Sequence, residues 1–172
     1  MRIVVLGCGY VGLELGRQLT AIGHDVVGVR RSASGLRAIE SAGFEAVEAD
    51  VTDPASLSAV PDADWVVFAA SSGGRGVESA RDVYVDGMRR AIESFAARGT
   101  PPERFVYTSS TGVYGDHDGE WVDEETPLFP SSRRAEILVE AERVAREVAA
   151  DHGIDGTIAR FAGLYGPNRS RL

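Results

Sequence analysis

The sequence predicts an α/β protein with one doubly wound parallel sheet of about six strands and helices on both faces. Three observations predict this class. Apolar runs of strand length alternate with amphipathic stretches of helix length along all 172 residues, an order typical of βαβ units. The apolar runs are nearly continuous in valine, isoleucine and phenylalanine, as expected of strands covered on both faces. A glycine-rich turn follows the first run and opens the first helical stretch.

Each predicted strand corresponds to one apolar run. In chain order the strands are RIVVL, DVVGVR, FEAVEA, DWVVFAA, ERFVYTS and DGTIARF, at 2–6, 25–30, 44–49, 64–70, 103–109 and 155–161. Helices are predicted between and after them at 10–22, 33–42, 77–98 and 132–151. The last helix has an apolar and a charged face. Its apolar face is Ile137, Ala141, Val144 and Val148, and the residues expected to face water are Glu140, Glu142, Arg143 and Glu147.

Two segments are predicted to be loops. Residues 50–63 carry two prolines and an Asp-Pro turn, with one short helical turn at 54–59. Residues 111–131 combine glycines, prolines and acidic residues, and a long irregular loop inside a compact domain often has a function. No segment has the composition of an interdomain linker, so residues 1–172 are interpreted as one domain.

The composition excludes several classes of function. A net charge of −8 argues against a nucleic-acid-binding surface. The single cysteine, Cys8, excludes a disulfide framework within the chain, and the scattered histidines have no metal-ligand spacing, so no metal is predicted. No apolar stretch reaches the ~18 residues of a membrane span, and a cytoplasmic protein is expected. All 18 basic residues are arginine, which removes every lysine-dependent mechanism.

The glycine-rich turn predicts a dinucleotide site. Gly7, Gly9 and Gly12 match GxGxxG directly after a strand and at the start of a helix, the context in which the motif binds a dinucleotide. The helix N-terminus would offer N–H groups and a positive dipole end to the pyrophosphate. The predicted contacts in this turn are Gly7, Cys8, Gly9, Tyr10, Val11 and Gly12. The alternative is a βα turn that only packs tightly.

The end of the second strand predicts the kind of dinucleotide. An acidic residue usually binds the ribose 2′-hydroxyl of NAD there, but this chain has Arg30, Arg31 and Ser32. Two guanidinium groups and a hydroxyl suit a 2′-phosphate, so NADP(H) is preferred and NAD(H) remains possible. The alternative is that the arginines only face solvent.

Three further strand ends contribute to the predicted site. Asp50 follows the third strand, where it is placed to accept a hydrogen bond from the adenine amino group. Small residues end the fourth strand and would let a cofactor lie across the edge of the sheet. The predicted cofactor contacts at these ends are Asp50, Val51, Ala69, Ala70, Ser71 and Thr108.

Five motifs occur in the order and spacing of a known family. They are GxGxxG at 7–12, ADVTD at 49–53, VFAA at 67–70, SSTGVYG at 109–115 and RFAGLYGP at 160–167. Together they resemble the extended short-chain dehydrogenase/reductases, the NAD-dependent epimerase/dehydratase family, over essentially the whole chain. The resemblance implies a Rossmann domain that binds NAD(P)(H). It also implies oxidoreductase-like hydride chemistry on a sugar or carbonyl substrate, with nucleotide sugars as one candidate class. The fold alone does not define the reaction.

The resemblance also implies catalytic positions, and this chain departs from most of them. Family members use a Ser or Thr with a Tyr-x-x-x-Lys pair, often supported by Asn. Ser110 matches the serine, but the tyrosine and lysine positions hold Arg134 and Leu138, and the asparagine position holds Tyr84. The predicted catalytic residues are therefore Ser110, Tyr114 and Arg134, and Tyr84 is a second tyrosine considered as the acid.

Two functions stay open on this basis. The chain is either an NADP(H)-linked enzyme or a non-catalytic NADP(H)-binding sensor, and the missing Tyr-Lys pair favours the second. Family members continue into a smaller C-terminal region that supplies much of the substrate site, so the chain is expected to be truncated before that region. The resemblance further implies a homodimer formed through helices 77–98 and 132–151.

Overall fold

The chain folds around one parallel sheet. A computed structural model describes residues 1–73, 76–167 and 169. Its six strands lie in the order β3-β2-β1-β4-β5-β6, and every neighbouring pair is parallel. The strands are β1 (Arg2–Leu6), β2 (Asp25–Arg30), β3 (Glu45–Glu48), β4 (Trp65–Phe68), β5 (Arg104–Ser110) and β6 (Asp155–Phe161). The winding reverses between β1 and β4, so the predicted fold class is confirmed.

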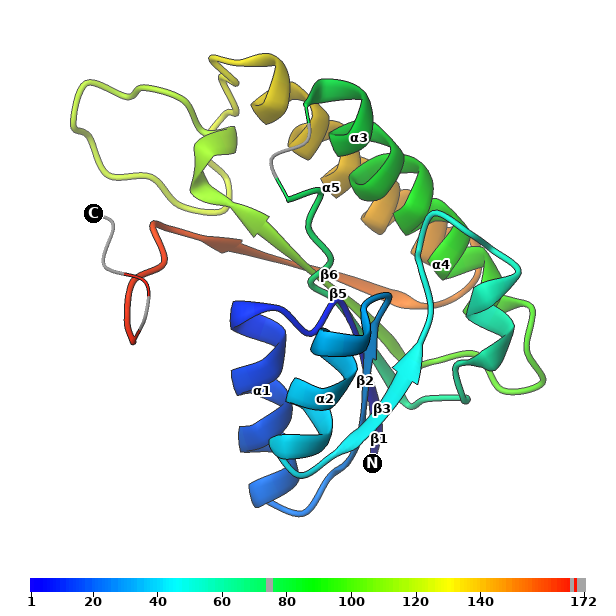
Figure 1. Ribbon diagram of the computed structural model, residues 1–172. Helices are drawn as coiled ribbons and strands as arrows, with labels where there is room; N and C mark the ends of the chain where they lie inside the picture. Colours follow the sequence, from blue (N-terminus) through cyan, green and yellow to red (C-terminus); the bar gives the residue numbers. More distant parts are fainter. Residues whose placement is uncertain (74–75, 168, 170–172) are drawn as a thin grey trace.

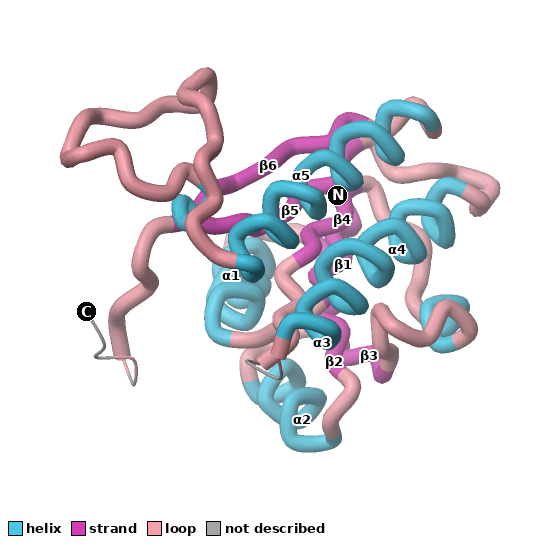
Figure 2. Tube along the Cα trace, turned by 90° about the horizontal axis from the view of Figure 1, so that it is seen from above, coloured by secondary structure: helices cyan, strands magenta, loops and turns pink. Residues whose placement is uncertain are grey.

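Helices cover the two faces of the sheet (Figure 1). One face carries α1 (Tyr10–Ala21) and α2 (Ala33–Ser41), and the other carries α3 (Val77–Arg81), α4 (Gly87–Ala96) and α5 (Arg133–Asp151). Two apolar clusters result, a smaller one around Ile39 and Phe44 and a larger one around Phe68 and Phe105. Seen from above, α4 and α5 run side by side along their face (Figure 2).

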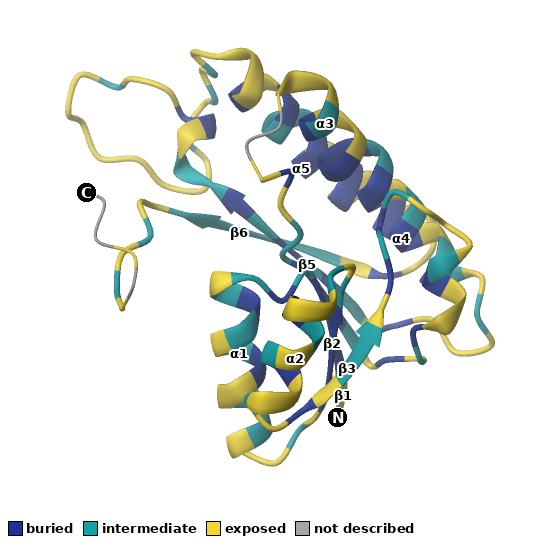
Figure 3. Cartoon of the chain, viewed as in Figure 1, coloured by how far each residue is buried: buried dark blue, intermediate teal, exposed yellow. Residues whose placement is uncertain are grey.

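Several boundaries differ from the sequence prediction. The expected helix at 77–98 is divided, because a π-helical turn at Asp82–Asp86 separates α3 from α4. β3 ends at Glu48 and β4 at Phe68, before the predicted ends at 49 and 70. Both predicted loops contain a 3-10 turn, at Ser56–Ala59 and at Thr111–Val113. The residues between Val113 and the start of α5 form a largely exposed arm that extends beyond the sheet (Figure 3).

One prediction about α5 is wrong. Glu142 does not face water but is fully buried, with no exposed surface. The helix packs against β5 and β6 on one side and α4 on the other, so its buried arc is wider than the apolar pattern indicates. Ser109 and Arg160, from those two strands, meet the Glu142 carboxylate there. None of the helices in the described residues has the length and apolarity that crossing a membrane requires.

Candidate functional site

The glycine-rich turn is built at the carboxyl end of β1. The amides of Gly7 and Cys8 both donate to the carbonyl of Val29, at 3.1 and 3.2 Å, which ties the turn to β2. Gly9 then caps α1 without a side chain that could accept from the first helical amides. A helix N-terminus with unsatisfied N–H groups therefore opens toward the edge of the sheet, which is a favourable place for a phosphate.

The absence of a side chain at Gly7 keeps β1 and β4 close together. Gly7 has φ +93°, and a Cβ atom there would collide with the backbone of Ala70 and lie 2.7 Å from the carbonyl carbon of Ala69. Gly12 is also confined, because its Cβ would lie 2.8 Å from the carbonyl oxygen of Gly7. These contacts bring the turn and the end of β4 together where the winding of the sheet reverses, the usual ligand position in this architecture.

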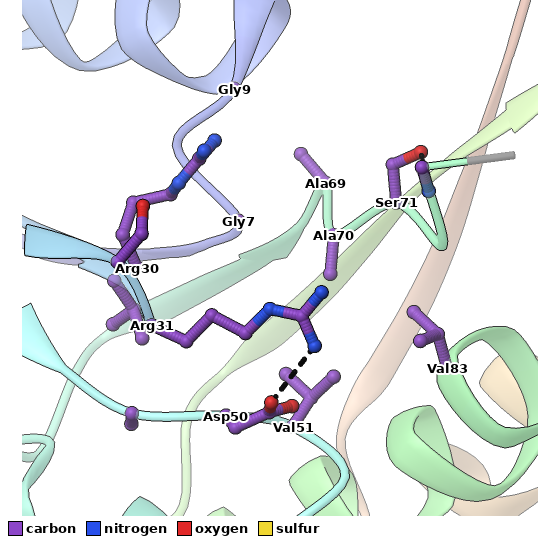
Figure 4. A pocket seen from close by; sticks show the side chains of 14 residues that line it. Gly7, Gly9, Arg30, Arg31, Asp50, Val51, Ala69, Ala70, Ser71 and Val83 are labelled. Carbon is purple, nitrogen blue, oxygen red and sulfur yellow. Dashed lines mark hydrogen bonds and ion pairs between the residues drawn. The ribbon is translucent and has the colours of Figure 1, made fainter. Parts of the chain in front are cut away.

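A first cavity of about 440 Å³ runs from this turn across the ends of β2, β3 and β4 (Figure 4). Arg30 points toward the turn and donates to the carbonyl of Cys8 at 3.1 Å. Arg31 reaches across the cavity and pairs with Asp50 at 3.0 Å. Predicted cofactor residues that line this cavity are Gly7, Gly9, Arg30, Arg31, Ser32, Asp50, Val51, Ala69, Ala70 and Ser71.

The charges in the first cavity are opposed. Burial by itself would raise the pKa of Asp50, but hydrogen bonds from Thr52 and from Arg31 bring that pKa below its ordinary value. Asp50 is therefore a carboxylate at neutral pH and offsets part of the Arg31 charge. Ser32 accepts a hydrogen bond from the Gly35 amide at 3.2 Å and so caps α2 beside the two arginines.

A second cavity of about 650 Å³ adjoins the first and shares Gly9, Ala69, Ala70 and Ser71 with it. Two of the predicted catalytic residues, Ser110 and Arg134, line this second cavity. Ser110 Oγ accepts from the Gly112 amide at 3.1 Å. Predicted cofactor residues on this side are Tyr10, Val11 and Thr108, in addition to the shared ones.

Tyr84 is the most connected polar group of the second cavity. Its hydroxyl accepts a hydrogen bond from Arg134 Nη2 at 3.0 Å and lies 3.3 Å from Ser71 Oγ. The Ser72 amide approaches it at 3.4 Å. Burial alone would raise the pKa of Tyr84, but the hydrogen bonds from Ser71 and Ser72 and the charge of Arg134 lower it below its ordinary value.

The remaining predicted residues lie outside both cavities. Tyr114 lines a separate hollow beside β6, where its hydroxyl donates to the Asp123 carbonyl at 2.7 Å and accepts from Arg160 at 2.8 Å. The structure therefore does not bring Tyr114 together with Ser110 and Arg134. Cys8 is buried beneath the turn, and burial raises the pKa of its thiol to about 12.

Some lining residues were not identified from the sequence. Val29 and Val83 line the first cavity, and Phe161 and Leu164 line the second. Their apolar character identifies them only as core, so no chemical signal distinguishes them. Within the described residues, no three His, Cys, Asp or Glu side chains gather as the ligands of a metal would.

Comparisons with known proteins agree with this architecture. The chain is 33% identical over 178 residues to protein YeeZ of Escherichia coli, covering 98% of this chain and 60% of YeeZ. A solved protein from Methylobacillus flagellatus, provisionally described as an NAD-dependent epimerase/dehydratase, is 36% identical with a TM-score of 0.78, over 98% of this chain and 56% of that one. DesIV, a dTDP-glucose 4,6-dehydratase from Streptomyces venezuelae solved with NAD, is 26% identical with a TM-score of 0.83, over 98% and 58%.

The chain thus spans about three fifths of the length of the relatives that it matches. A sequence model of the NAD dependent epimerase/dehydratase family matches residues 3–172. The match includes the glycine-rich turn and both cavities at the ends of the strands. This chain belongs to the NAD-dependent epimerase/dehydratase family.

Proposed function

We propose that the chain binds a nicotinamide dinucleotide along the carboxyl edge of its sheet, with NADP(H) preferred over NAD(H). The observation that carries this proposal is the continuity of the two cavities around the glycine-rich turn. The pyrophosphate would lie against Gly9 and the N-terminus of α1, because the amides there have no side-chain acceptor. The adenosine half would occupy the first cavity, and the nicotinamide half the second.

The preference for NADP(H) rests on Arg30 and Arg31. Both guanidinium groups line the first cavity, beside the capped start of α2. An additional phosphate on the ribose would compete with Asp50 for Arg31 and offer that guanidinium a doubly charged partner. Each charge-assisted hydrogen bond contributes about 1.5–3 kcal/mol, so losing both arginines should weaken NADPH by roughly 100-fold or more.

Calorimetric titration with NADPH and with NADH tests this proposal. The Arg30→Ala/Arg31→Ala double variant should lose far more affinity for NADPH than for NADH. Arg37→Ala is the matched control, because Arg37 is an exposed residue of α2 and does not line the cavity. Equal losses for both dinucleotides would refute the preference for NADP(H). Binding of neither dinucleotide to the unaltered chain would refute the cofactor site itself.

The activity that fits this site is oxidoreductase-like chemistry on a sugar or carbonyl compound, with nucleotide sugars as the substrate class. Family membership supports this, as does the 26% identity to a dTDP-glucose dehydratase. When bound, the dinucleotide would supply or accept a hydride. Both Ser110 and Arg134 line the second cavity. Ser110 would bind the reacting oxygen, and Arg134 would orient the substrate.

A second candidate is a non-catalytic NADP(H) sensor. Arg134 and Leu138 hold the positions that the tyrosine and the lysine would take, and the chain has no lysine. The discriminating assay follows the conversion of UDP-glucose, UDP-galactose and dTDP-glucose by chromatography of the products with NADP⁺ present, because an epimerase or a dehydratase returns the hydride and accumulates no NADPH. Turnover that falls in Ser110→Ala identifies an enzyme, and tight binding without turnover identifies the sensor.

Light scattering tests the homodimer through α4 and α5, which a monomer at high concentration would exclude.

A further inference from the structure

Tyr84 and Arg134 form a hydrogen-bonded pair at the wall of the second cavity. Arg134 Nη2 donates to the Tyr84 hydroxyl at 3.0 Å, and its guanidinium carbon lies 5.5 Å from the centre of the Tyr84 ring. Among the described residues, no carboxylate forms an ion pair with Arg134, whereas Arg133 next to it pairs with Glu136 at 2.7 Å. The charge of Arg134 is therefore directed at the phenol oxygen.

The backbone that carries Tyr84 is unusual. The residue lies at the centre of the π-helical turn Asp82–Asp86, and such turns occur frequently at functional sites. The turn places a side chain that is only 7% exposed at the wall of the second cavity. Its hydroxyl then lies between the start of α5, which supplies Arg134, and the segment after β4, which supplies Ser71.

The other tyrosines are less suited to proton transfer in this cavity. Tyr107 also lines it, but burial raises the pKa of its hydroxyl well above the ordinary value, so it stays protonated. Tyr114 opens into a different hollow. Tyr10 lines the cavity from α1, and 42% of its surface is exposed. Tyr114 is also buried and accepts from Arg160, but it lies outside the second cavity. Of the tyrosines that line the second cavity, Tyr84 alone combines burial with a hydrogen bond from a cationic side chain.

We propose that Tyr84 is the proton-donating residue of the second cavity and that Arg134 is the positioning residue that holds its phenolate form. This inference rests on the proposed function and deepens it. It assigns the proton transfer to a tyrosine on the π-helical turn, 50 residues before Arg134, which occupies the position where the family has its tyrosine. The substrate class is a carbonyl compound, or the corresponding alcohol in the reverse direction.

A bound reduced nicotinamide would supply the hydride for the new C–H bond as the carbonyl π bond breaks, and the proton of Tyr84 Oη would form the new O–H bond. The carbonyl compound would be reduced to an alcohol and the dinucleotide oxidised. Tyr84 would be left as a phenolate beside the Arg134 guanidinium, and a proton from solvent would restore it. In the reverse direction the phenolate would accept the proton of the alcohol.

An absorbance titration of the tyrosines tests the pair without any cofactor or substrate. The chain has five tyrosines, and the pKa of one of them, Tyr84, should lie below the ordinary value because of its hydrogen bonds and the Arg134 charge. Tyr84→Phe should remove that first ionisation, and Arg134→Leu should shift it to higher pH. Arg133→Leu is the matched control one residue earlier in α5 and should leave it unchanged. Circular dichroism confirms that each variant is folded.

Two results would overturn the assignment. One is an early ionisation that persists in Tyr84→Phe, and the other is an equal effect of Arg134→Leu and Arg133→Leu, which a purely structural contact would give. Where a nucleotide sugar is turned over, Tyr84→Phe should lower the rate by about 10²- to 10⁴-fold, and a retained rate would also overturn it. Without turnover the titration decides. NADPH affinity of the same variants is measured separately, so a failed cofactor site is distinguishable.

Discussion

Replacing Glu142 by leucine should cost more stability than any surface change in α5. The Glu142 carboxylate accepts hydrogen bonds from Ser109 Oγ at 2.6 Å and from Arg160 Nε and Nη2 at 3.0 and 2.8 Å. It has no exposed surface, and the Arg160 side chain is 13% exposed. Leucine has a similar volume, so Glu142→Leu removes the charge and these bonds without opening a large cavity.

The magnitude follows from what the substitution leaves behind. Arg160 would keep its hydrogen bond to Tyr114 at 2.8 Å but would have lost its only carboxylate partner among the described residues. Leaving one member of a buried pair unpaired costs about 3–5 kcal/mol. With a urea m-value of about 2 kcal/mol/M, the unfolding midpoint should fall by roughly 1.5–2.5 M.

Urea denaturation followed by circular dichroism measures this effect, and α5 provides its own control. Glu140 also pairs with an arginine, Arg81, but both side chains are substantially exposed, at 30% and 45%. Glu140→Leu should therefore change the stability by about 0–1 kcal/mol. Similar losses at the two positions would refute the argument from burial.

A double-mutant cycle separates the pair from its surroundings. Arg160→Met should be destabilising alone, since it leaves the Glu142 carboxylate buried and uncompensated. The Glu142→Leu/Arg160→Met double variant should be less destabilised than the sum of the two single variants. Additive losses would show that the two side chains do not depend on each other, contrary to the geometry.

Three other predictions concern the glycine-rich turn and the first cavity. Gly7→Ala should destabilise the fold and abolish dinucleotide binding, whereas Gly23→Ala, with the same φ of +93° but nothing within 4 Å, should cost only about 1–2 kcal/mol in urea denaturation. Cys8 should resist thiol reagents until the protein unfolds, because burial raises its pKa to about 12. The Asp50 pKa is lowered, despite burial, by hydrogen bonds from the following loop and from Arg31, so its stabilisation is present at neutral pH and lost on acidification. Asp50→Asn should flatten the fall in urea midpoint below about pH 4.

The fold could be predicted closely because its signals are local and repeated. Each apolar run became a strand, since Val- and Ile-rich segments flanked by turns have few alternatives in a βαβ chain. The division of the helix at 77–98 could not be predicted, because the helical periodicity of the sequence gives no signal for the π-helical turn at Asp82–Asp86. Periodicity likewise assigned Glu142 to water, since the helix pattern alone does not show that Arg160 of the following strand, β6, meets its carboxylate.

More of the cofactor site than of the catalytic site could be predicted from the sequence. The glycine-rich turn and Arg31 belong to one βαβ unit, in which the motif fixes where each residue lies relative to the dinucleotide. Their place in the first cavity could therefore be predicted from the motif. The approach of Arg134 to Tyr84 joins residues 50 positions apart on two different elements. The sequence predicts Tyr114 as the catalytic tyrosine and keeps Tyr84 as a second one. The structure instead places Tyr84, with its contact to Arg134, in the second cavity and Tyr114, with its contact to Arg160, outside it.

The absence of lysine limits how this second cavity can work. A lysine beside a tyrosine can both stabilise the phenolate and exchange a proton with it, whereas an arginine stays protonated at any physiological pH. Arg134 can therefore lower the energy of the Tyr84 phenolate but cannot relay its proton. Its planar guanidinium has further N–H groups, however, and none of them bonds to another of the described residues, so one can hold a second oxygen while Nη2 holds Tyr84. The arrangement thus favours a substrate oxygen bound by Arg134 and protonated by Tyr84, with Ser71 beside the hydroxyl to pass the proton from solvent.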